Sequence, residues 1–398
     1  MPNSLARKKI AIVCDWLTNM GGAEKVIYSL HKLFPDAPIY TTLYDEKRIH
    51  GFEEATIYSS FLQRIPLSQK KHQLFLSMMP MAIESLDLSE YDIVISSSHS
   101  VAKGIITKPD TIHISYCHTP MRYAWEHWEL ESRLKQFPSF LHDSIKKKIH
   151  KLRIWDRLSA DRVDHFIVNS KYVGQRVKKY YRRDSLVIHP PVNISQFKTT
   201  KPNDYFLMVG RMIPYKRFDL VIETFNRIGK KLLIAGTGPE EQKLQKLAKP
   251  NVEFLGRVSD GQLKELYSHC QALIFPQLED FGITPLECMA SGRPVIAYGQ
   301  GGALETVVAG KTGLHFKEQS VESLTNILNE FEGKQWNSEE ITKHASKFSE
   351  ERFHKAMTDF ICSKMSGKNY SLHFWQSSPG FSGVQLCLHM HNGPMRKS

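Results

Sequence analysis

The sequence predicts an α/β protein with two doubly wound domains that face each other across a cleft. Short apolar runs of strand length alternate with segments of helical spacing, and the same alternation starts again in the second half of the chain. Strands of this kind form a parallel sheet with helices on both faces. With 398 residues, 41% of them hydrophobic, the chain can fill two or three packed domains, which excludes a wholly disordered chain.

The first half opens with an apolar run at residues 9–14 that ends in a polar loop. A glycine pair then starts a segment in which Val26, Leu30 and Leu33 recur at helical spacing. Further strands are expected at residues 39–43, 92–96, 111–117 and 165–168. These elements predict a first Rossmann-like domain over residues 1–190.

The second half repeats this order after a break. Two adjacent prolines, Pro190 and Pro191, and the polar stretch after them cannot continue a helix or a strand, so residues 191–202 are expected to be a linker. A second domain is predicted over residues 203–348. Its expected strands are residues 205–209, 231–235, 252–255, 272–275 and 294–297. Residues 367–398 show no period and no acidic residue, which predicts a disordered or non-native tail.

The formal net charge of +12 and the pI near 9.2 require an anionic partner: nucleic acid, a phosphorylated ligand or an anionic membrane surface. Most of the excess lies in residues 133–183, where 15 Lys and Arg stand against four Asp. Apolar residues recur among these lysines at helical spacing. This predicts a basic amphipathic helix on an anionic bilayer; the alternative is an ordinary surface helix with a solvated basic face. The six apolar residues are Phe140, Leu141, Ile145, Ile149, Leu152 and Trp155.

The sequence indicates a reduced, cytoplasmic protein. No apolar stretch approaches the roughly 18 residues of a membrane span, and the first apolar run is shorter than the roughly 7–15 residues of a signal-peptide core. The six cysteines are scattered, without a Cys-x-x-Cys pair. This argues against a structural zinc site or a disulfide framework.

Two clusters at strand-to-helix turns have the chemistry of a phosphate site. Gly21 and Gly22 open the first helix, where free N–H groups and the helix dipole can meet an anion; a plain tight turn is the alternative. Gly210, Arg211 and Lys216 put two cations at the end of another strand. Arg offers a planar fork and Lys a point charge to phosphate oxygens, against the alternative of a solvated basic loop.

Two further clusters contain candidate hydrogen-bonding groups. Glu279 and Glu287 flank a loop marked by Gly282 and Pro285, so that the first glutamate precedes a helix and the second is expected in its first turn. Such carboxylates can accept hydrogen bonds from the hydroxyl groups of a polyol, although capping or surface glutamates would look the same. A lone histidine is more often structural, but His118 follows a buried strand directly and precedes a Thr-Pro turn, which makes it a better site candidate than most.

Polar and aromatic residues of the first half are candidates for acceptor contacts. His99 and Lys103 follow a predicted strand and would touch acceptor hydroxyls or cap a helix. Tyr123, Trp125 and Trp128 would stack on sugar rings, lie at a lipid interface or pack in the core.

Together these motifs resemble retaining glycosyltransferase family 4, whose fold is GT-B, over roughly residues 8–366. The E-x7-E arrangement with an upstream G-R-x(4)-K is specific. The segments HTPMRYAW and VGRMIPYKRFDLVI resemble bacterial mannosyltransferases of polysaccharide and O-antigen assembly. The resemblance implies that residues 349–366 form a last helix that crosses back to the first domain.

The resemblance also implies a role for each position. Gly22 would approach the donor diphosphate, and Arg211 and Lys216 would neutralise it as it leaves. Glu279 would bind the donor sugar and Glu287 the ribose, while His118 would line the reaction centre. The catalytic set is then His118, Arg211, Lys216 and Glu279. The donor-binding set is Gly21, Gly22, Gly210, Arg211, Lys216, Glu279, Phe281, Gly282 and Glu287, with Gly301 and Gly302 as a further turn nearby.

The function expected from this resemblance is transfer of a hexose with retained configuration, with GDP-mannose as donor and a lipid-linked saccharide as acceptor, at the inner face of the cytoplasmic membrane. A UDP-sugar donor or an inactive homologue remains the alternative. The chain has no Asp-x-Asp, so no metal ion and no cofactor is expected. An oxidoreductase lacks its G-x-G-x-x-G after a strand, and no nucleic-acid-binding module is present.

Overall fold

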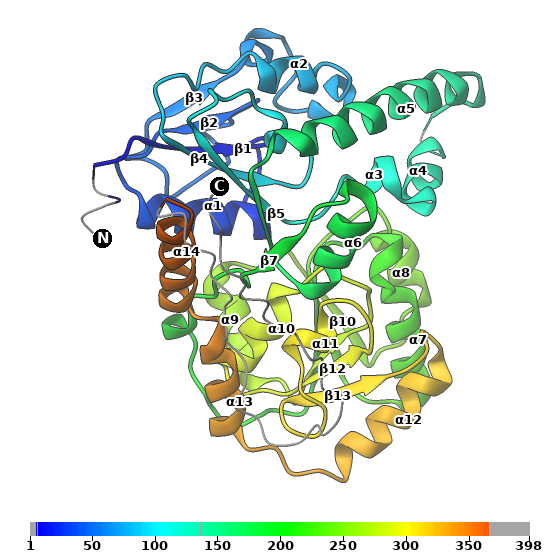
Figure 1. Ribbon diagram of the computed structural model, residues 1–398. Coiled ribbons are helices and arrows are strands. Elements are labelled where there is room, and N and C mark those ends of the chain that lie inside the picture. The colour runs from blue at the N-terminus through cyan, green and yellow to red at the C-terminus, as the bar shows by residue number, and fades with distance from the viewer. Residues whose placement is uncertain (1–4, 6, 136, 366–398) are drawn as a thin grey trace, which may run out of the picture.

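The computed structural model describes residues 5, 7–135 and 137–365, and the predicted tail at residues 367–398 lies outside them. The chain forms two α/β domains, one above the other in Figure 1, each built on one parallel sheet. The first sheet has the order β3-β2-β1-β4-β5-β6-β7, and the second has the order β10-β9-β8-β11-β12-β13. The predicted fold class is therefore confirmed.

The strands of both sheets are short, and the central ones are buried on both faces. Those of the first sheet are β1 (Ile10–Cys14), β2 (Ile39–Thr41), β3 (Ile57–Ser59), β4 (Ile93–Ser98), β5 (Ile112–Cys117), β6 (His165–Val168) and β7 (Ser185–Val187). Those of the second are β8 (Phe206–Val209), β9 (Leu232–Ala235), β10 (Val252–Gly256), β11 (Leu273–Phe275), β12 (Val295–Tyr298) and β13 (Gly313–Phe316).

Three strands were not predicted: β3, β7 and β13. All three are the outermost strands of their sheets. Every residue of β3 and β7 is at least partly exposed, and β13 opens with a glycine, so none of them shows the continuous apolar run that marks a central strand.

Helices cover both faces of each sheet, as Figure 1 shows. The first domain contains α1 (Gly22–Leu33), α2 (Met79–Glu84), α3 (Arg122–Trp125), α4 (His127–Leu134), α5 (His142–Ser159) and α6 (Lys171–Tyr181). The second contains α7 (Phe218–Ile228), α8 (Glu241–Leu247), α9 (Asp260–His269), α10 (Ile283–Ala290), α11 (Ala303–Thr306), α12 (Val321–Glu332) and α13 (Ser338–Ala345). No helix within the described residues is long and apolar enough to span a membrane.

The last helix, α14 (Glu350–Met365), returns to the first domain. Its Phe353, Met357 and Phe360 are buried in the same core as strands β1 and β4 and helix α1. The predicted crossing of the terminal helix is therefore confirmed, and it ties the two domains together outside the linker.

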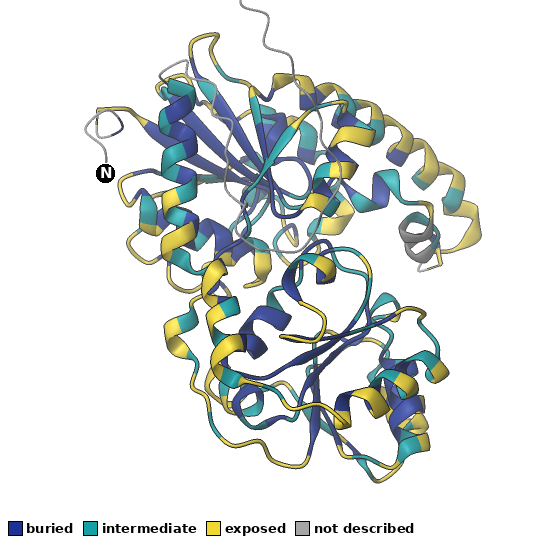
Figure 2. Cartoon of the chain, turned by 60° about the horizontal axis from the view of Figure 1, so that its bottom comes forward, coloured by how far each residue is buried: buried dark blue, intermediate teal, exposed yellow. Residues whose placement is uncertain are grey.

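Helix α5 corrects one prediction. Ile149 and Leu152 are buried in the core of the first domain, and Ile145 and Trp155 pack against that core. The predicted apolar stripe thus holds the helix to its own domain and does not lie on a bilayer. Of the six apolar residues, only Phe140 and Leu141 are exposed (Figure 2 shows the exposed outer face of the helix).

Candidate active site

Three of the predicted clusters and the His99 loop lie together because each follows a strand at which the strand order of its sheet reverses; the remaining cluster, with His118, follows β5. The strand order reverses between β1 and β4 in the first sheet and between β8 and β11 in the second. Loops at the carboxyl ends of strands bind ligands at such switch points. These four strands are followed by the glycine pair, the His99 loop, the Arg211–Lys216 loop and the Glu279 loop, respectively.

Glu279 lies at the centre of the second-domain side of the site. Tyr215 donates its hydroxyl to Glu279 Oε1 at 3.2 Å, and Lys216 Nζ lies 3.6 Å from the same oxygen. Gly210 lets Lys216 approach, because its φ is +149° and an added Cβ would lie 3.0 Å from Nζ. Arg211 follows and is exposed. The site therefore places Lys216 beside a carboxylate that also accepts a hydrogen bond from Tyr215.

Glu287 lies deeper and bridges the domains. It is the fifth residue of α10, so it is one turn further into the helix than predicted. Its carboxylate accepts hydrogen bonds from Lys25 of α1 at 2.5 Å and from the hydroxyl of Tyr267 at 3.1 Å. No local pattern marks Lys25, because a lysine in an amphipathic helix is ordinary until the facing domain is placed against it.

The glycines shape the loops around these carboxylates. An added Cβ on Gly22 would lie 3.2 Å from Ile283, across the domain interface. Gly302 donates its N–H to the carbonyl of Glu279 at 2.9 Å, and an added Cβ on it would lie 2.2 Å from Phe281 Cα. The ring of Phe281 is itself buried against His189, at a ring distance of 5.3 Å. The ring of Phe281 is therefore not exposed to a ligand, and only the backbone of this residue can contact one.

Asp280 forms an ion-pair clasp between the domains. Its carboxylate accepts hydrogen bonds from Arg122 at 2.6 and 3.1 Å and from Arg176 at 2.7 Å, and both arginines belong to the first domain. Ser170, also in the first domain, donates to the Asp280 carbonyl. Arg122 additionally lies 3.8 Å from Glu279. Sequence reasoning missed this clasp, because the two arginines that bind Asp280 are 158 and 104 positions away in the chain.

His118 follows β5 as predicted, and its ring lies 6.5 Å from that of His99. Its Nε2 is 2.8 Å from the hydroxyl of Ser97, and its carbonyl accepts a hydrogen bond from Asn169 at 3.0 Å. Burial, together with nearby His99, lowers the pKa of His118 to about 3. The ring is therefore neutral at physiological pH and does not add to the positive charge of the site.

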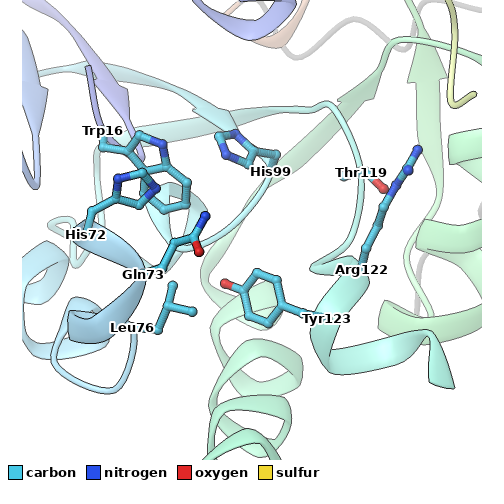
Figure 3. A pocket seen from close by; sticks show the side chains of 8 residues that line it. All are labelled: Trp16, His72, Gln73, Leu76, His99, Thr119, Arg122 and Tyr123. Atoms are coloured by element: carbon cyan, nitrogen blue, oxygen red, sulfur yellow. The ribbon is translucent and has the colours of Figure 1, made fainter. Parts of the chain in front are cut away.

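A cavity of about 200 Å³ lies beside His99 in the first domain (Figure 3). His99 and Tyr123 line it, as expected for acceptor contacts. The rest of its wall, which sequence reasoning missed, is Trp16, His72, Gln73, Leu76, Thr119 and Arg122. A second cavity of about 390 Å³ lies on the other side of the clasp and is also lined by Arg122.

Lys103 and Trp125 are corrections. Lys103 is 1% exposed and forms an ion pair with Asp156, while the indole N–H of Trp125 donates to the same carboxylate at 2.6 Å. The ring of Trp125 stacks on Tyr180 at 4.8 Å. Both residues hold the first domain together around a buried carboxylate, and neither lines the cavity beside His99.

Two parallel sheets, with cations and carboxylates at the switch point of one and a small polar cavity at that of the other, form the two-domain architecture of the GT-B fold class. Comparison with known sequences makes this specific. Residues 20–196 match the family described as Glycosyltransferase Family 4, and residues 191–351 match Glycosyl transferases group 1. The two matches together run from residue 20 to residue 351, and each describes a glycosyltransferase family to which one half of the chain is similar.

Curated relatives are similar over part of their length. An α-1,3/1,6-mannosyltransferase ALG2 from Dictyostelium discoideum is 28% identical over 54% of this chain and 60% of its own length. The O-antigen chain mannosyltransferase RfbU from Salmonella typhimurium is 34% identical over 40% of this chain and 48% of its own. The chain thus spans about half to three fifths of these two relatives.

Solved structures share the fold along almost the whole chain. Sucrose-phosphate synthase from Thermosynechococcus elongatus has a TM-score of 0.70 at 16% identity, over 91% of this chain and 100% of that one. HepE from Anabaena, in complex with UDP and glucose, has a TM-score of 0.65 at 17% identity, over 90% and 100%. At these identities the likeness concerns the fold alone.

Proposed function

We propose that the protein transfers mannose from GDP-mannose to a lipid-linked saccharide, with retention of the anomeric configuration and without a metal ion. The observation that carries this proposal is the cluster of Lys216, Tyr215 and Arg122 around Glu279 at the domain interface. Support for the sugar comes from the mannosyltransferase names of the relatives, including O-antigen chain enzymes of Salmonella and Escherichia coli.

The cationic, anionic and neutral side chains of the site have different roles in this reaction. Arg211 and Lys216 stabilise the negative charge that develops on the departing diphosphate, as fixed cations do at a leaving group. Glu279 accepts hydrogen bonds from the sugar hydroxyls. Glu287 accepts hydrogen bonds from the ribose hydroxyls in place of those that it accepts from Lys25 and Tyr267. Neutral His118 lines the reaction centre without repelling these cations.

The donor is tested by thermal shift with GDP-mannose, UDP-glucose and ADP-glucose, followed by transfer assays with the nucleotide sugar that stabilises the protein. We expect the largest shift with GDP-mannose, because a ligand that binds only the folded state raises its stability. Proton NMR of the product then reports the anomeric configuration. Stabilisation by a UDP-sugar alone would contradict the choice of donor.

Metal independence is tested in the same assay. Because cationic side chains supply the charge that a divalent ion would otherwise bring, we expect activity to persist in excess EDTA. Complete loss of turnover in EDTA, restored by magnesium, would contradict this part of the proposal.

Peripheral attachment to the inner face of the cytoplasmic membrane is proposed for the outer face of α5. Lys147, Lys151, Ile154 and Leu158 follow one another at helical spacing and are all exposed, and Phe140 precedes the helix at 80% exposure. Cations beside apolar side chains favour an anionic bilayer. We expect binding to anionic but not to neutral liposomes, lost when residues 146–148 are replaced by Glu. Equal binding to both liposomes would refute it.

A further inference from the structure

The cavity beside His99 has the size and lining of a site for one sugar ring. Its volume of about 200 Å³ is below the roughly 300–1,000 Å³ of pockets for drug-sized ligands. Trp16 and Leu76 offer apolar surface, while Gln73 and Tyr123 offer polar groups (Figure 3). The far wall is Arg122, whose guanidinium lies 3.8 Å from Glu279. The cavity is therefore adjacent to the carboxylate proposed to hold the donor sugar.

Asp15 is fixed beside this cavity by an unusual number of donors. It follows β1 and is 1% exposed. Four successive backbone N–H groups, those of residues 99–102, donate to its carboxylate at 2.7, 3.0, 2.6 and 2.6 Å. Since β1 and β4 are the two strands of the switch point, the loop after β4 wraps around the residue that follows β1.

Asp15 also holds the ring of His99. Its Oδ2 lies 2.9 Å from His99 Nδ1, and the side chain of His99 keeps 30% of its surface exposed. An Nδ1–H that donates to a carboxylate leaves Nε2 of the neutral ring as a hydrogen-bond acceptor. The edge of His99 packs against Trp16 at a ring distance of 4.8 Å, which limits its rotation.

The charges around His99 favour a ring that can take up a proton. Burial alone would lower the pKa of His99, but the contact with Asp15, and the nearby carboxylate of Glu24, raise it above its ordinary value. His118, the third ionisable group near this ring at a centroid distance of 6.5 Å, stays neutral because its pKa is lowered to about 3. A carboxylate that orients a histidine and stabilises its protonated form is the arrangement of a general base.

We propose that His99 is the general base for the acceptor sugar bound in this cavity, and that Asp15 is its positioning residue. This rests on the function proposed above and adds a proton acceptor to it. The acceptor hydroxyl oxygen approaches C1 of the donor sugar on the face from which the diphosphate leaves, so that the configuration is retained, and forms the new bond there. The bond between C1 and the phosphate oxygen breaks, and its electron pair leaves with the nucleoside diphosphate. The hydroxyl proton passes to His99 Nε2, and from the resulting imidazolium to solvent.

The first test measures transfer by His99→Ala, His99→Gln and the wild type, with GDP-mannose as donor and octyl α-mannoside as the acceptor probe. General bases contribute roughly 100- to 10,000-fold, so we expect kcat of His99→Ala to fall at least about 100-fold. The Kd for GDP-mannose should change less than about twofold, because His99 lies on the acceptor side. Imidazole added to His99→Ala should restore part of the activity. His127→Ala, at an exposed histidine of α4, is the matched control.

The outcomes separate this inference from the proposed function. Transfer by the wild type with unchanged kcat in His99→Ala overturns the base while leaving the function intact. An equal loss of donor binding and turnover, without rescue by imidazole, reduces His99 to a structural residue. A wild type that transfers from no nucleotide sugar contradicts the proposed function instead.

The second test does not need turnover. In protein labelled with ¹⁵N-histidine, NMR reports which ring nitrogen of His99 carries the proton. We expect Nδ1–H with a bare Nε2, and a pKa of His99 above the ordinary value of histidine. Asp15→Asn should lower the pKa of His99 if the variant folds; the tautomer of the wild type decides the question if it does not. A ring protonated on Nε2, with Nδ1 bare, would overturn the proposal.

Discussion

The interdomain clasp predicts that Asp280→Ala loosens the closed arrangement of the two domains. The variant removes the three hydrogen bonds that Arg122 and Arg176 make with this carboxylate. The two arginine side chains are only 21% and 9% exposed, so the loss leaves buried positive charge. Removing one partner of a buried ion pair destabilises a protein by about 3–5 kcal/mol.

The expected magnitude lies at the lower end of that range. Arg122 keeps Glu279 at 3.8 Å, and Arg176 keeps Glu126 as an ion-pair partner. We therefore expect about 3 kcal/mol, expressed mainly as domain opening, since opening lets water reach both arginines. If turnover needs the closed form, kcat/KM falls by about 100-fold, because 1.36 kcal/mol corresponds to tenfold.

Two measurements separate opening from unfolding. Small-angle X-ray scattering should show a larger radius of gyration for Asp280→Ala than for the wild type, and circular dichroism should show unchanged secondary structure. The matched control is Asp219→Ala, which breaks a surface pair with Arg217 in the same domain, where both partners are 32–42% exposed and about 0–1 kcal/mol is at stake. Asp280→Ala that matches this control in scattering and in kcat/KM would refute the clasp.

Three further outcomes are expected. Lys216→Ala should lower kcat/KM at least tenfold, or about 1.4 kcal/mol of transition-state stabilisation, and an unchanged value in steady-state assays would remove this lysine from the site. Burial lowers the pKa of His113 to about 4 and that of His118 to about 3, so the unfolded chain takes up protons at a higher pH than the folded protein does. As the pH drops from 6.5 towards 4, each of these histidines should lower the free energy of unfolding, measured with urea, by about 1.4 kcal/mol per pH unit. A free energy of unfolding that does not change over this pH range would contradict the burial of both histidines. Gly302→Ala forces a Cβ into the backbone of the neighbouring loop and should destabilise by about 1–3 kcal/mol, whereas Gly261→Ala in helix α9, with nothing within 4 Å, should be neutral or stabilising; equal melting temperatures would refute the close approach.

Much of the fold could be predicted because most central strands can be recognised from a few consecutive residues of the sequence. A buried parallel strand is an unbroken apolar run, and nine of the ten predicted strands lie inside the two sheets; the tenth, β10, is an outermost strand. Edge strands such as β3 and β7 owe their conformation to a single neighbour, and no local pattern marks them. The apolar stripe on α5 shows what such a pattern leaves open. Helical spacing shows that one face of the helix is apolar, but not whether a protein core or a bilayer covers that face.

The residues of the site also fall into those that could be predicted from local sequence and those that could not. Positions at the carboxyl end of a strand were predictable, because a parallel sheet brings all such ends to one edge. Partners across the cleft were not: Lys25 meets Glu287 over 262 positions, and Arg122 meets Asp280 over 158. Lys103 shows why position alone does not suffice, since it follows a strand at the correct edge yet turns inward to Asp156.

The same geometry explains why Asp15 was overlooked. In the sequence it merely ends an apolar run, and only the order of the strands places the β4 loop around it. An aspartate that only capped that loop would accept hydrogen bonds from backbone N–H groups and would bind no side chain. Asp15 satisfies four such groups and still binds a histidine whose ring lines a cavity. Serine or asparagine at this position could cap the turn but could not stabilise an imidazolium. The choice of a carboxylate therefore points to the histidine as the group that it serves.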